Sequence, residues 1–438
     1  MHSSQIVTVF LDLVVIMAVA RVLGWLAEKV GQPAVIGEIT AGILVGPTVL
    51  GTDLSSALFP GESRPYLSLL ANVGVAVFMF VAGLELDRGM FAGARRSISV
   101  VSAAAYLFPF VLGCGVAAIA LSRHATGDRL NFALFVGCAL AVTAFPVLVR
   151  ILHDRGLIRT RLGQLSLACA ALVDILAWSA LAVVLALAHP AAGTQWRLFL
   201  LIPLVAVTWW VVRPALARLA EVGTEQTMIV VGVGGALLLG AVTEWIGLHL
   251  IFGAFAFGVV FPRVRRTTVE SGARVLSSVL LPGFFVVSGL AVDLGSLDRT
   301  AVGELAVIVV VAIAGKLLGV YAAGRATGLR PRPAAALAAL LNTRGLTELV
   351  ILNVGLGIGI IGPQLYSLLV VMALVTTAMT APALRVIGVP ERLADEFGDD
   401  EHGDEESPAE RASVELAAGE DESAARDESR AAESGGRH

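Results

Sequence analysis

The chain has 438 residues, of which 57% are hydrophobic and only 15% are charged. Soluble globular proteins carry about one quarter charged residues, so this composition excludes an ordinary water-soluble domain and indicates a lipid environment. Because a spanning helix takes about 20 apolar residues, residues 6–388 have room for roughly twelve to fourteen spans in one large membrane domain.

Windows of about 19 residues predict about thirteen spanning helices, and hence an all-α polytopic membrane protein. The predicted spans lie near residues 6–27, 34–50, 66–84, 98–121, 130–152, 162–188, 198–217, 227–243, 246–262, 275–292, 301–324, 333–358 and 364–387. The second span is rich in glycine, which suits close helix packing, and it also carries an acid, Glu38. The sequence leaves open whether this acid inside the membrane has a structural role or a transport role.

Two of the predicted spans are interrupted near the middle by polar residues, proline or glycine. The residues expected to be unwound are Ala144, Phe145 and Pro146 in the fifth span, beside Thr143, and Asn342, Thr343, Arg344 and Gly345 in the twelfth. A proline inside a helix removes a backbone hydrogen bond, and irregular backbone at membrane depth is tolerated only where protein or water covers it. Because the two spans occupy equivalent places in two six-helix halves, they indicate inverted repeats with a site where the crossed, discontinuous helices meet.

Asp174 stands alone near the middle of the sixth span, with no other charge nearby along the chain. An ionisable residue at this depth is expensive and is therefore a candidate for function rather than packing. Burial and neighbouring charge together set the proton affinity of such a carboxylate, so a single group can exchange a proton for a metal cation. We expect Asp174 to hold the transported ion.

Two further charged positions lie inside predicted spans. Lys316, in the eleventh span, is one of only two lysines among 31 Lys and Arg residues. A buried lysine can lose its proton whereas arginine effectively cannot, so we expect Lys316 to be the partner of Asp174. The alternative is a lysine that snorkels to the cytoplasmic interface. Arg344 and Glu348, spaced i and i+4, are expected to form a structural ion pair.

The distribution of charge predicts the orientation and the domains. If the N-terminus lies outside, most loop arginines fall on the cytoplasmic side, as the positive-inside rule requires. Residues 1–392 are then the transmembrane domain. Residues 393–438 are strongly acidic with few large apolar residues, which predicts a disordered cytoplasmic tail and no nucleotide-binding domain.

Six segments carry recognisable motifs in one fixed order. They are 31–38 (GQPAVIGE), 41–47 (AGILVGP), 80–87 (FVAGLELD), 142–152 (VTAFPVLVRIL), 247–263 (GLHLIFGAFAFGVVFPR) and 342–361 (NTRGLTELVILNVGLGIGII). Together they resemble the monovalent cation:proton antiporters of the Kef/CHX type, within the sodium/hydrogen exchanger family. The resemblance covers roughly residues 6–388 and implies an NhaA-like fold with thirteen spans, a homodimer, and a site beside two crossed, unwound helices.

The resemblance also implies roles for particular residues. Asp174 matches the family's essential aspartate, and Lys316 matches the basic position that pairs with it. Thr143 and Pro146 match the first unwound crossing, and Asn342, Thr343 and Arg344 fall at the second. The family usually has Asp or Asn immediately before the essential aspartate, and this chain has Val173 there. The resemblance therefore predicts neither the stoichiometry nor the preferred ion.

The functional hypothesis is a secondary active transporter that exchanges protons for Na⁺ or K⁺ across the cytoplasmic membrane by alternating access. Asp174 binds either a proton or the cation, which is the only metal expected. The sequence predicts no enzyme activity, no cofactor and no nucleic-acid partner. A cation channel or a transporter of organic substrates on the same fold remains the alternative.

Overall fold

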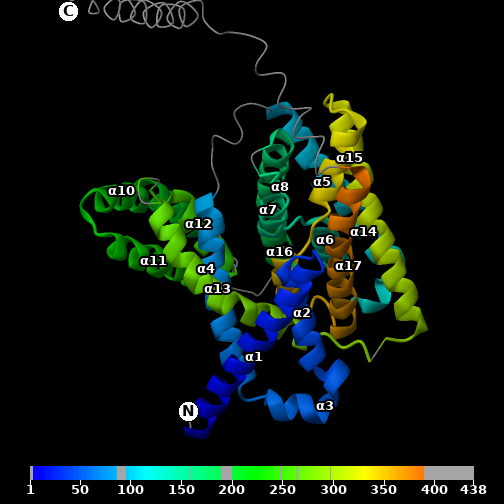
Figure 1. Ribbon diagram of the computed structural model, residues 1–438, viewed down its shortest axis with the longest axis horizontal. Helices are drawn as coiled ribbons and strands as arrows, with labels where there is room; N and C mark the ends of the chain where they lie inside the picture. Colours follow the sequence, from blue (N-terminus) through cyan, green and yellow to red (C-terminus); the bar gives the residue numbers. More distant parts are fainter. Residues whose placement is uncertain are drawn as a thin grey trace, which may run out of the picture. The chain divides into compact units, whose positions relative to one another are not determined.

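A computed structural model describes most of the chain as helices (Figure 1). The residues that it describes are 3–85, 95–158, 160–188, 200–246, 249–262, 264, 266–295 and 297–388. The chain divides into two units, residues 1–389 and 390–438. The second unit, and with it the acidic tail expected at 393–438, lies outside the described residues.

The elements of the first unit follow one another without a strand in the described ranges. They are α1 (Ser3–Lys29), α2 (Ala34–Val45), α3 (Pro47–Leu58), α4 (Arg64–Glu85), α5 (Arg95–Ile119), η2 (Ser122–His124), α6 (Arg129–Ala141), α7 (Phe145–Asp154), α8 (Arg161–Ala188), α9 (Leu201–Val207), η4 (Thr208–Val212), α10 (Arg213–Val222), α11 (Glu225–Ile246), α12 (Leu250–Val260), α13 (Arg266–Leu290), α14 (Arg299–Ala326), α15 (Pro331–Leu341), α16 (Leu346–Gly357) and α17 (Pro363–Ile387). Each predicted span overlaps one or more of these helices, though not always over its full length.

Within the described part of the chain, ten helices are long and apolar enough to cross a membrane. The number is eleven if α2 and α3, which meet at a bend of 64°, count as one span. The bend follows Gly46, and Pro47 begins α3, a position where its missing N–H costs nothing. The protein is therefore a multi-pass, all-helical membrane protein.

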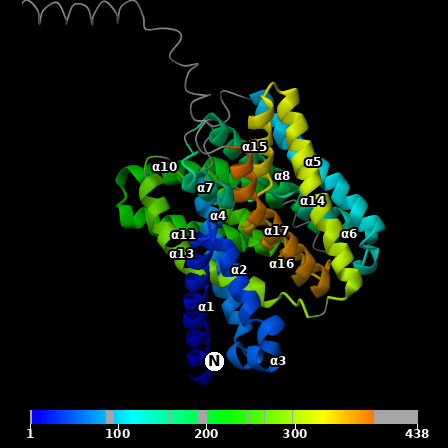
Figure 2. The same cartoon turned by 45° about the vertical axis from the view of Figure 1, so that its right-hand side comes forward.

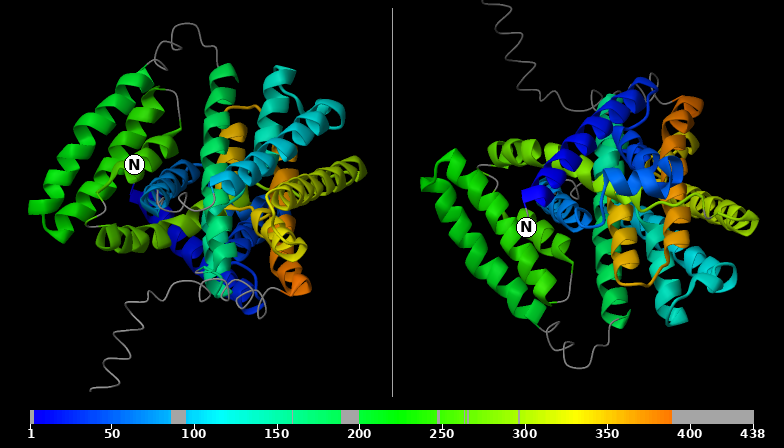
Figure 3. Two further views of the ribbon diagram at one scale, coloured as in Figure 1. Left: turned by 90° about the horizontal axis from the view of Figure 1, so that it is seen from above. Right: turned by 90° about the horizontal axis from the view of Figure 1, so that it is seen from below.

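The helices pack chiefly within two groups (Figures 2 and 3). The core group consists of α5, α6, α7, α8, α14, α15, α16 and α17. The scaffold group consists of α1, α2, α3, α4, α11, α12 and α13. Contacts between the groups are sparse and include those of α13 with α16 and of α2 with α17.

Close helix packing in the scaffold group depends on glycine, and it follows the same pattern twice. A side chain at Gly37 of α2 would collide with the backbone of α1 at Leu23. A side chain at Gly253 of α12 would collide in the same way with α11 at Leu239. Glycine is therefore required at both positions by the close approach of the backbones.

The pattern continues one helix further. Gly42 of α2 lies directly against Gly289 of α13, and Gly258 of α12 lies against Gly83 of α4. The contacts among α1, α2 and α13 thus recur among α11, α12 and α4, with the same spacing of glycines along α2 and α12.

Polar contacts join the two groups at several places, among them Ser288 of α13. The Tyr366 hydroxyl of α17 donates to the Ser288 carbonyl of α13 over 2.9 Å, and the Asn353 amide of α16 donates to the Ser288 hydroxyl over 2.8 Å. Elsewhere Arg150 of α7 forms an ion pair with Glu28 of α1.

Candidate functional site

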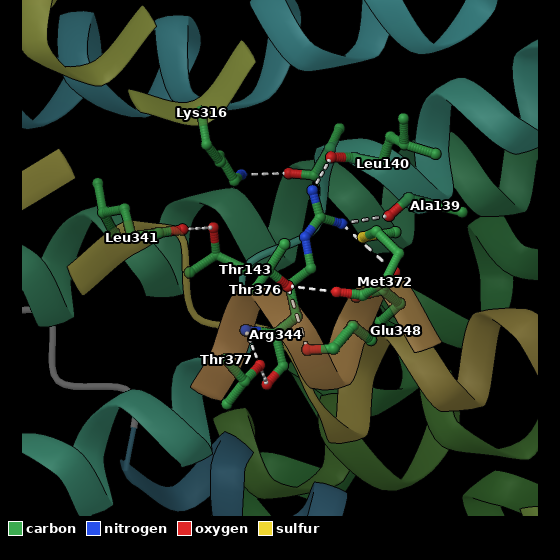
Figure 4. A network of polar contacts seen from close by, with 12 residues as sticks. Ala139, Leu140, Thr143, Lys316, Leu341, Arg344, Glu348, Met372, Thr376 and Thr377 are labelled. Atoms are coloured by element: carbon green, nitrogen blue, oxygen red, sulfur yellow. Dashed lines mark hydrogen bonds and ion pairs between the residues drawn. The ribbon is translucent and has the colours of Figure 1, made fainter. Parts of the chain in front are cut away.

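The two breaks of the core group meet one another (Figure 4). Residues 142–144 separate α6 from α7, and residues 342–345 separate α15 from α16. The Ala144 amide donates to the Thr343 carbonyl over 3.0 Å, and the Thr143 hydroxyl donates to the Leu341 carbonyl over 2.9 Å. All four of these residues are buried. The crossing is thus a direct backbone contact between segments almost 200 residues apart.

The first break is shorter than the sequence predicts. Phe145 and Pro146 are the first two residues of α7, so the expectation that they are unwound is wrong. A proline in the first turn of a helix loses no hydrogen bond, because the N–H there has no partner within the helix. The proline therefore marks the start of the second half-helix.

Threonines of α17 hold the second break. The Thr377 hydroxyl donates to the Arg344 carbonyl over 2.7 Å and accepts from the Arg344 amide over 3.0 Å. The Asn342 amide donates to the Thr376 carbonyl over 3.5 Å, and the Thr343 hydroxyl caps the Leu340 carbonyl at the end of α15. Two adjacent threonines in an apolar span were the only sequence signal for this role, and we did not predict it.

Asp174 lies on α8 beside the first turns of both second half-helices. The carboxylate interacts with the Phe145 amide at the start of α7 and with the Thr347 hydroxyl at the start of α16. The side chain is buried, and its Oδ1 atom has no hydrogen-bond partner. Helix N-termini carry partial positive charge, so they stabilise an anion at this place while leaving part of its bonding capacity unused.

Lys316 does not form the ion pair with Asp174 that the sequence suggested. Its ammonium is fully buried and donates to the carbonyls of Ala105 and Ala141, the former over 2.7 Å. The carbonyl of Ala141 ends α6, has no partner within that helix and carries the partial negative charge of a helix C-terminus. Lys316 thus acts on Asp174 only at longer range, and the snorkelling alternative is wrong because the ammonium points into the interior.

Arg344 and Glu348 form the predicted ion pair, at 3.4 Å between Nη1 and Oε1, and both side chains are fully buried. The guanidinium also donates to the carbonyls of Ala139 over 3.0 Å and Leu140 over 2.5 Å. With Lys316, it therefore supplies a cationic donor to each of the last three carbonyls of α6 (Figure 4).

A cavity of about 1060 Å³ opens between the two groups. Its walls come from α1, α2, α4, α7, α13 and α16. Val147 of α7 and Leu346 of α16 reach it from the half-helices that surround Asp174. Glu38 lies on the scaffold side of the cavity, together with Arg21. The structure therefore places Glu38 on the approach to the crossing and outside the crossing itself.

A buried carboxylate at the junction of two broken helices, in a multi-pass membrane protein, defines a transporter core. Residues 14–386 match the transmembrane sodium/hydrogen exchanger family, and the chain belongs to this family. It is a family of transporters rather than of enzymes.

Several relatives are similar over most of the chain. A Na⁺/H⁺ antiporter, NhaS4, of Synechocystis is 38% identical over 87% of this chain and 97% of its own length. Cation/H⁺ antiporter 20 of Arabidopsis thaliana is 34% identical, and K⁺/H⁺ antiporter 1 of Saccharomyces cerevisiae is 31% identical. These matches cover 86% and 91% of this chain but 48% and 49% of the two relatives, so the chain spans about half their length.

The fold is also found in a solved structure. The sodium proton antiporter MjNhaP1 of Methanocaldococcus jannaschii superposes with a TM-score of 0.66 over 90% of this chain and 99% of that protein, at 14% identity. At this identity the similarity establishes the fold.

Proposed function

We propose that this protein exchanges protons for a monovalent cation, Na⁺ or K⁺, across the cytoplasmic membrane by alternating access. Asp174 binds either a proton or the cation. The observation that carries the proposal is a buried carboxylate with an unpartnered oxygen, held at the amide ends of α7 and α16 near a cavity. The names of the cyanobacterial and yeast relatives, a Na⁺/H⁺ and a K⁺/H⁺ antiporter, are consistent with both cations.

The charge on Asp174 enforces exchange in this mechanism. Moving an uncompensated carboxylate past an apolar barrier is costly, and binding of a proton or a cation removes that cost. The empty site therefore cannot cross easily, so each transit carries one kind of ion or the other.

Thr143 and Lys316 assist the site from the first break and from α14. The Thr143 hydroxyl donates a hydrogen bond to the Leu341 carbonyl, so the hydroxyl oxygen keeps lone pairs that can face a bound cation. Lys316 sets the local potential while it stays bound to the end of α6.

The proposed architecture is that of thirteen spans in two inverted six-helix repeats, in which α1, α2 and α4 of the first half correspond to α11, α12 and α13 of the second. The repeated glycine contacts, Gly37 with α1 and Gly253 with α11, support it. We propose residues 1–392 as the transmembrane domain and 393–438 as a cytoplasmic tail, with the N-terminus outside. The functional unit is a homodimer.

Everted membrane vesicles containing a pH-sensitive dye test the function. Addition of Na⁺, K⁺ or Li⁺ in turn is expected to release the proton gradient with at least one cation, and Asp174→Ala at equal expression is expected to give none. A cation current without counter-movement of protons would support a channel instead. Cation-driven proton movement in Asp174→Ala would exclude Asp174 as the shared site.

A further inference from the structure

An aromatic contact connects the two helix groups one turn beyond the ion-binding carboxylate. Trp178 follows Asp174 by four residues on α8, so both side chains lie on the same face of that helix. The indole packs edge-to-face against Phe252 of α12, with ring centroids 5.7 Å apart and ring planes at 82°. Trp178 belongs to the core group and Phe252 to the scaffold group.

The cavity and the contact of Trp178 with Phe252 lie on opposite sides of Asp174. Arg150 and Ile158 line the cavity and precede the first residue of α8, Arg161. Along α8 the order is then the cavity end of the helix, Asp174, and Trp178. The Trp178–Phe252 contact is therefore on the side of Asp174 that the cavity does not reach.

The surroundings of Trp178 are apolar. It is 5% exposed, and its neighbours Ala177 and Leu181 on α8 are fully buried. The indole Nε1 atom has no hydrogen-bond partner, although a buried tryptophan usually has one. Since the polar end of the ring contributes no bond here, what the side chain supplies is bulk against Phe252.

We propose that the Trp178–Phe252 contact is the seal that closes the ion path on the side opposite the cavity. This inference rests on the proposed function, because a seal matters only if ions reach Asp174. The contact joins a core helix to a scaffold helix, so relative movement of the two groups opens it. In the arrangement described here, the cavity approaches Asp174 from the side of Val147 and Leu346, and the aromatic contact lies on the other side.

Cysteine labelling tests the seal without requiring transport. Asp174→Cys is placed in sealed vesicles of each orientation and treated with a membrane-impermeant thiol reagent. Reaction is expected from the face that bears Arg150 and is not expected from the opposite face. Adding Trp178→Ala is expected to make the opposite face reactive as well. The unmodified chain gives the background from Cys114, Cys138 and Cys169, which are present throughout.

Three variants separate the seal from a general loss of packing. Trp178→Phe keeps an aromatic ring and should keep the opposite face unreactive, whereas Phe252→Ala should reproduce the effect of Trp178→Ala. Phe257→Ala is the matched control, since Phe257 also lies on α12 but packs against Phe80 within the scaffold group, with centroids 5.9 Å apart. It removes a similar ring without opening the path.

The outcomes distinguish the seal from the antiport hypothesis. Equal reaction of Asp174→Cys from both faces while Trp178 is present would overturn the seal. The seal would also be overturned if neither Trp178→Ala nor Phe252→Ala makes the opposite face reactive. If labelling follows the expected pattern but the unmodified protein moves no protons with any cation, the seal stands and the proposed function fails. If Trp178→Ala does not insert, Phe252→Ala alone decides.

Discussion

At the crossing, the C-terminal end of α6 carries partial negative charge, and the N-terminal ends of α7 and α16 carry partial positive charge. The two kinds of end differ in how completely their charged partners are hydrogen-bonded. At the end of α6, Arg344 and Lys316 donate to the carbonyls of residues 139–141, so each carbonyl has a cationic donor. At the starts of α7 and α16, Asp174 retains an oxygen without a partner. The last three carbonyls of α6 therefore all have charged hydrogen-bond donors, whereas the carboxylate at the starts of α7 and α16 is only partly hydrogen-bonded. We infer that the first set of charges holds the crossing together and that the second remains available for exchange.

The largest effect on transport is expected at Asp174, at the starts of α7 and α16. Asp174→Asn should abolish cation-driven proton movement in vesicles, because the amide can neither bind a proton nor balance the charge of a cation. It should leave the unfolding temperature in detergent unchanged or higher, since a buried, partly unpartnered charge has been removed. A clear loss of stability would mean that Asp174 is a structural charge and would break the contrast between the two ends.

Substitution of Arg344, at the end of α6, should instead lower the stability of the protein. Arg344→Ala removes two hydrogen bonds to α6 and leaves Glu348 as an unpaired buried charge. Breaking a buried ion pair in this way costs about 3–5 kcal/mol, so we expect a large drop in unfolding temperature or failure to insert.

A second variant identifies the cause of that loss. Arg344→Ala combined with Glu348→Ala should recover part of the stability, since the unpaired carboxylate is gone. If the double variant is as unstable as the single one, the carbonyl contacts of Arg344 carry the whole effect and the ion pair contributes nothing.

Lys316→Ala should lie between these two cases. Two bonds from a buried ammonium to backbone carbonyls are lost, and a hydrogen bond to a charged group contributes about 1.5–3 kcal/mol. The pH profile of exchange should change as well, because the charge acts on Asp174 through space. The matched control is Lys29→Ala, the other lysine, which stacks on the surface residue Trp25 and should leave both readouts unchanged. Complete loss of transport in stable Lys316→Ala would make Lys316 a coupling residue.

Much of the crossing could be predicted from the sequence because its features are unusual in a membrane span. A lone aspartate in an apolar run, a run of polar residues and a proline all conflict with a continuous helix in lipid, so Asp174 and both breaks were found. The pair of Arg344 and Glu348 was predicted from its i, i+4 spacing, although Arg344 lies in the break just before the first residue of α16. These features depend on residues close in sequence.

The remaining features depend on tertiary neighbours. The carbonyl of Ala141 becomes a ligand for Lys316 only after α6 ends and α14 packs beside it, and backbone acceptors leave no mark in the sequence. Charge complementarity alone therefore suggested Asp174, whereas the direct hydrogen bonds of Lys316 go to backbone carbonyls. The contact of Trp178 with Phe252 was missed for a related reason, since an aromatic residue in an apolar span is unremarkable until the opposing helix is known.

The smallest predicted effect concerns the boundary between the two groups. Tyr366→Phe removes the hydrogen bond to Ser288 and a longer one to Asn353 Oδ1, and it should cost about 1 kcal/mol in stability without affecting the ion site. Tyr106→Phe is the matched control, because Tyr106 is equally enclosed but its hydroxyl contacts only the Cys138 sulfur at 3.5 Å, within the core group. The bond of Tyr366 crosses the boundary, so its removal should also change the exchange rate, measured as the rate of dye recovery, whereas Tyr106→Phe should not. Equal exchange rates of the two variants would mean that apolar packing between the groups, and not the polar contacts around Ser288, governs their relative movement.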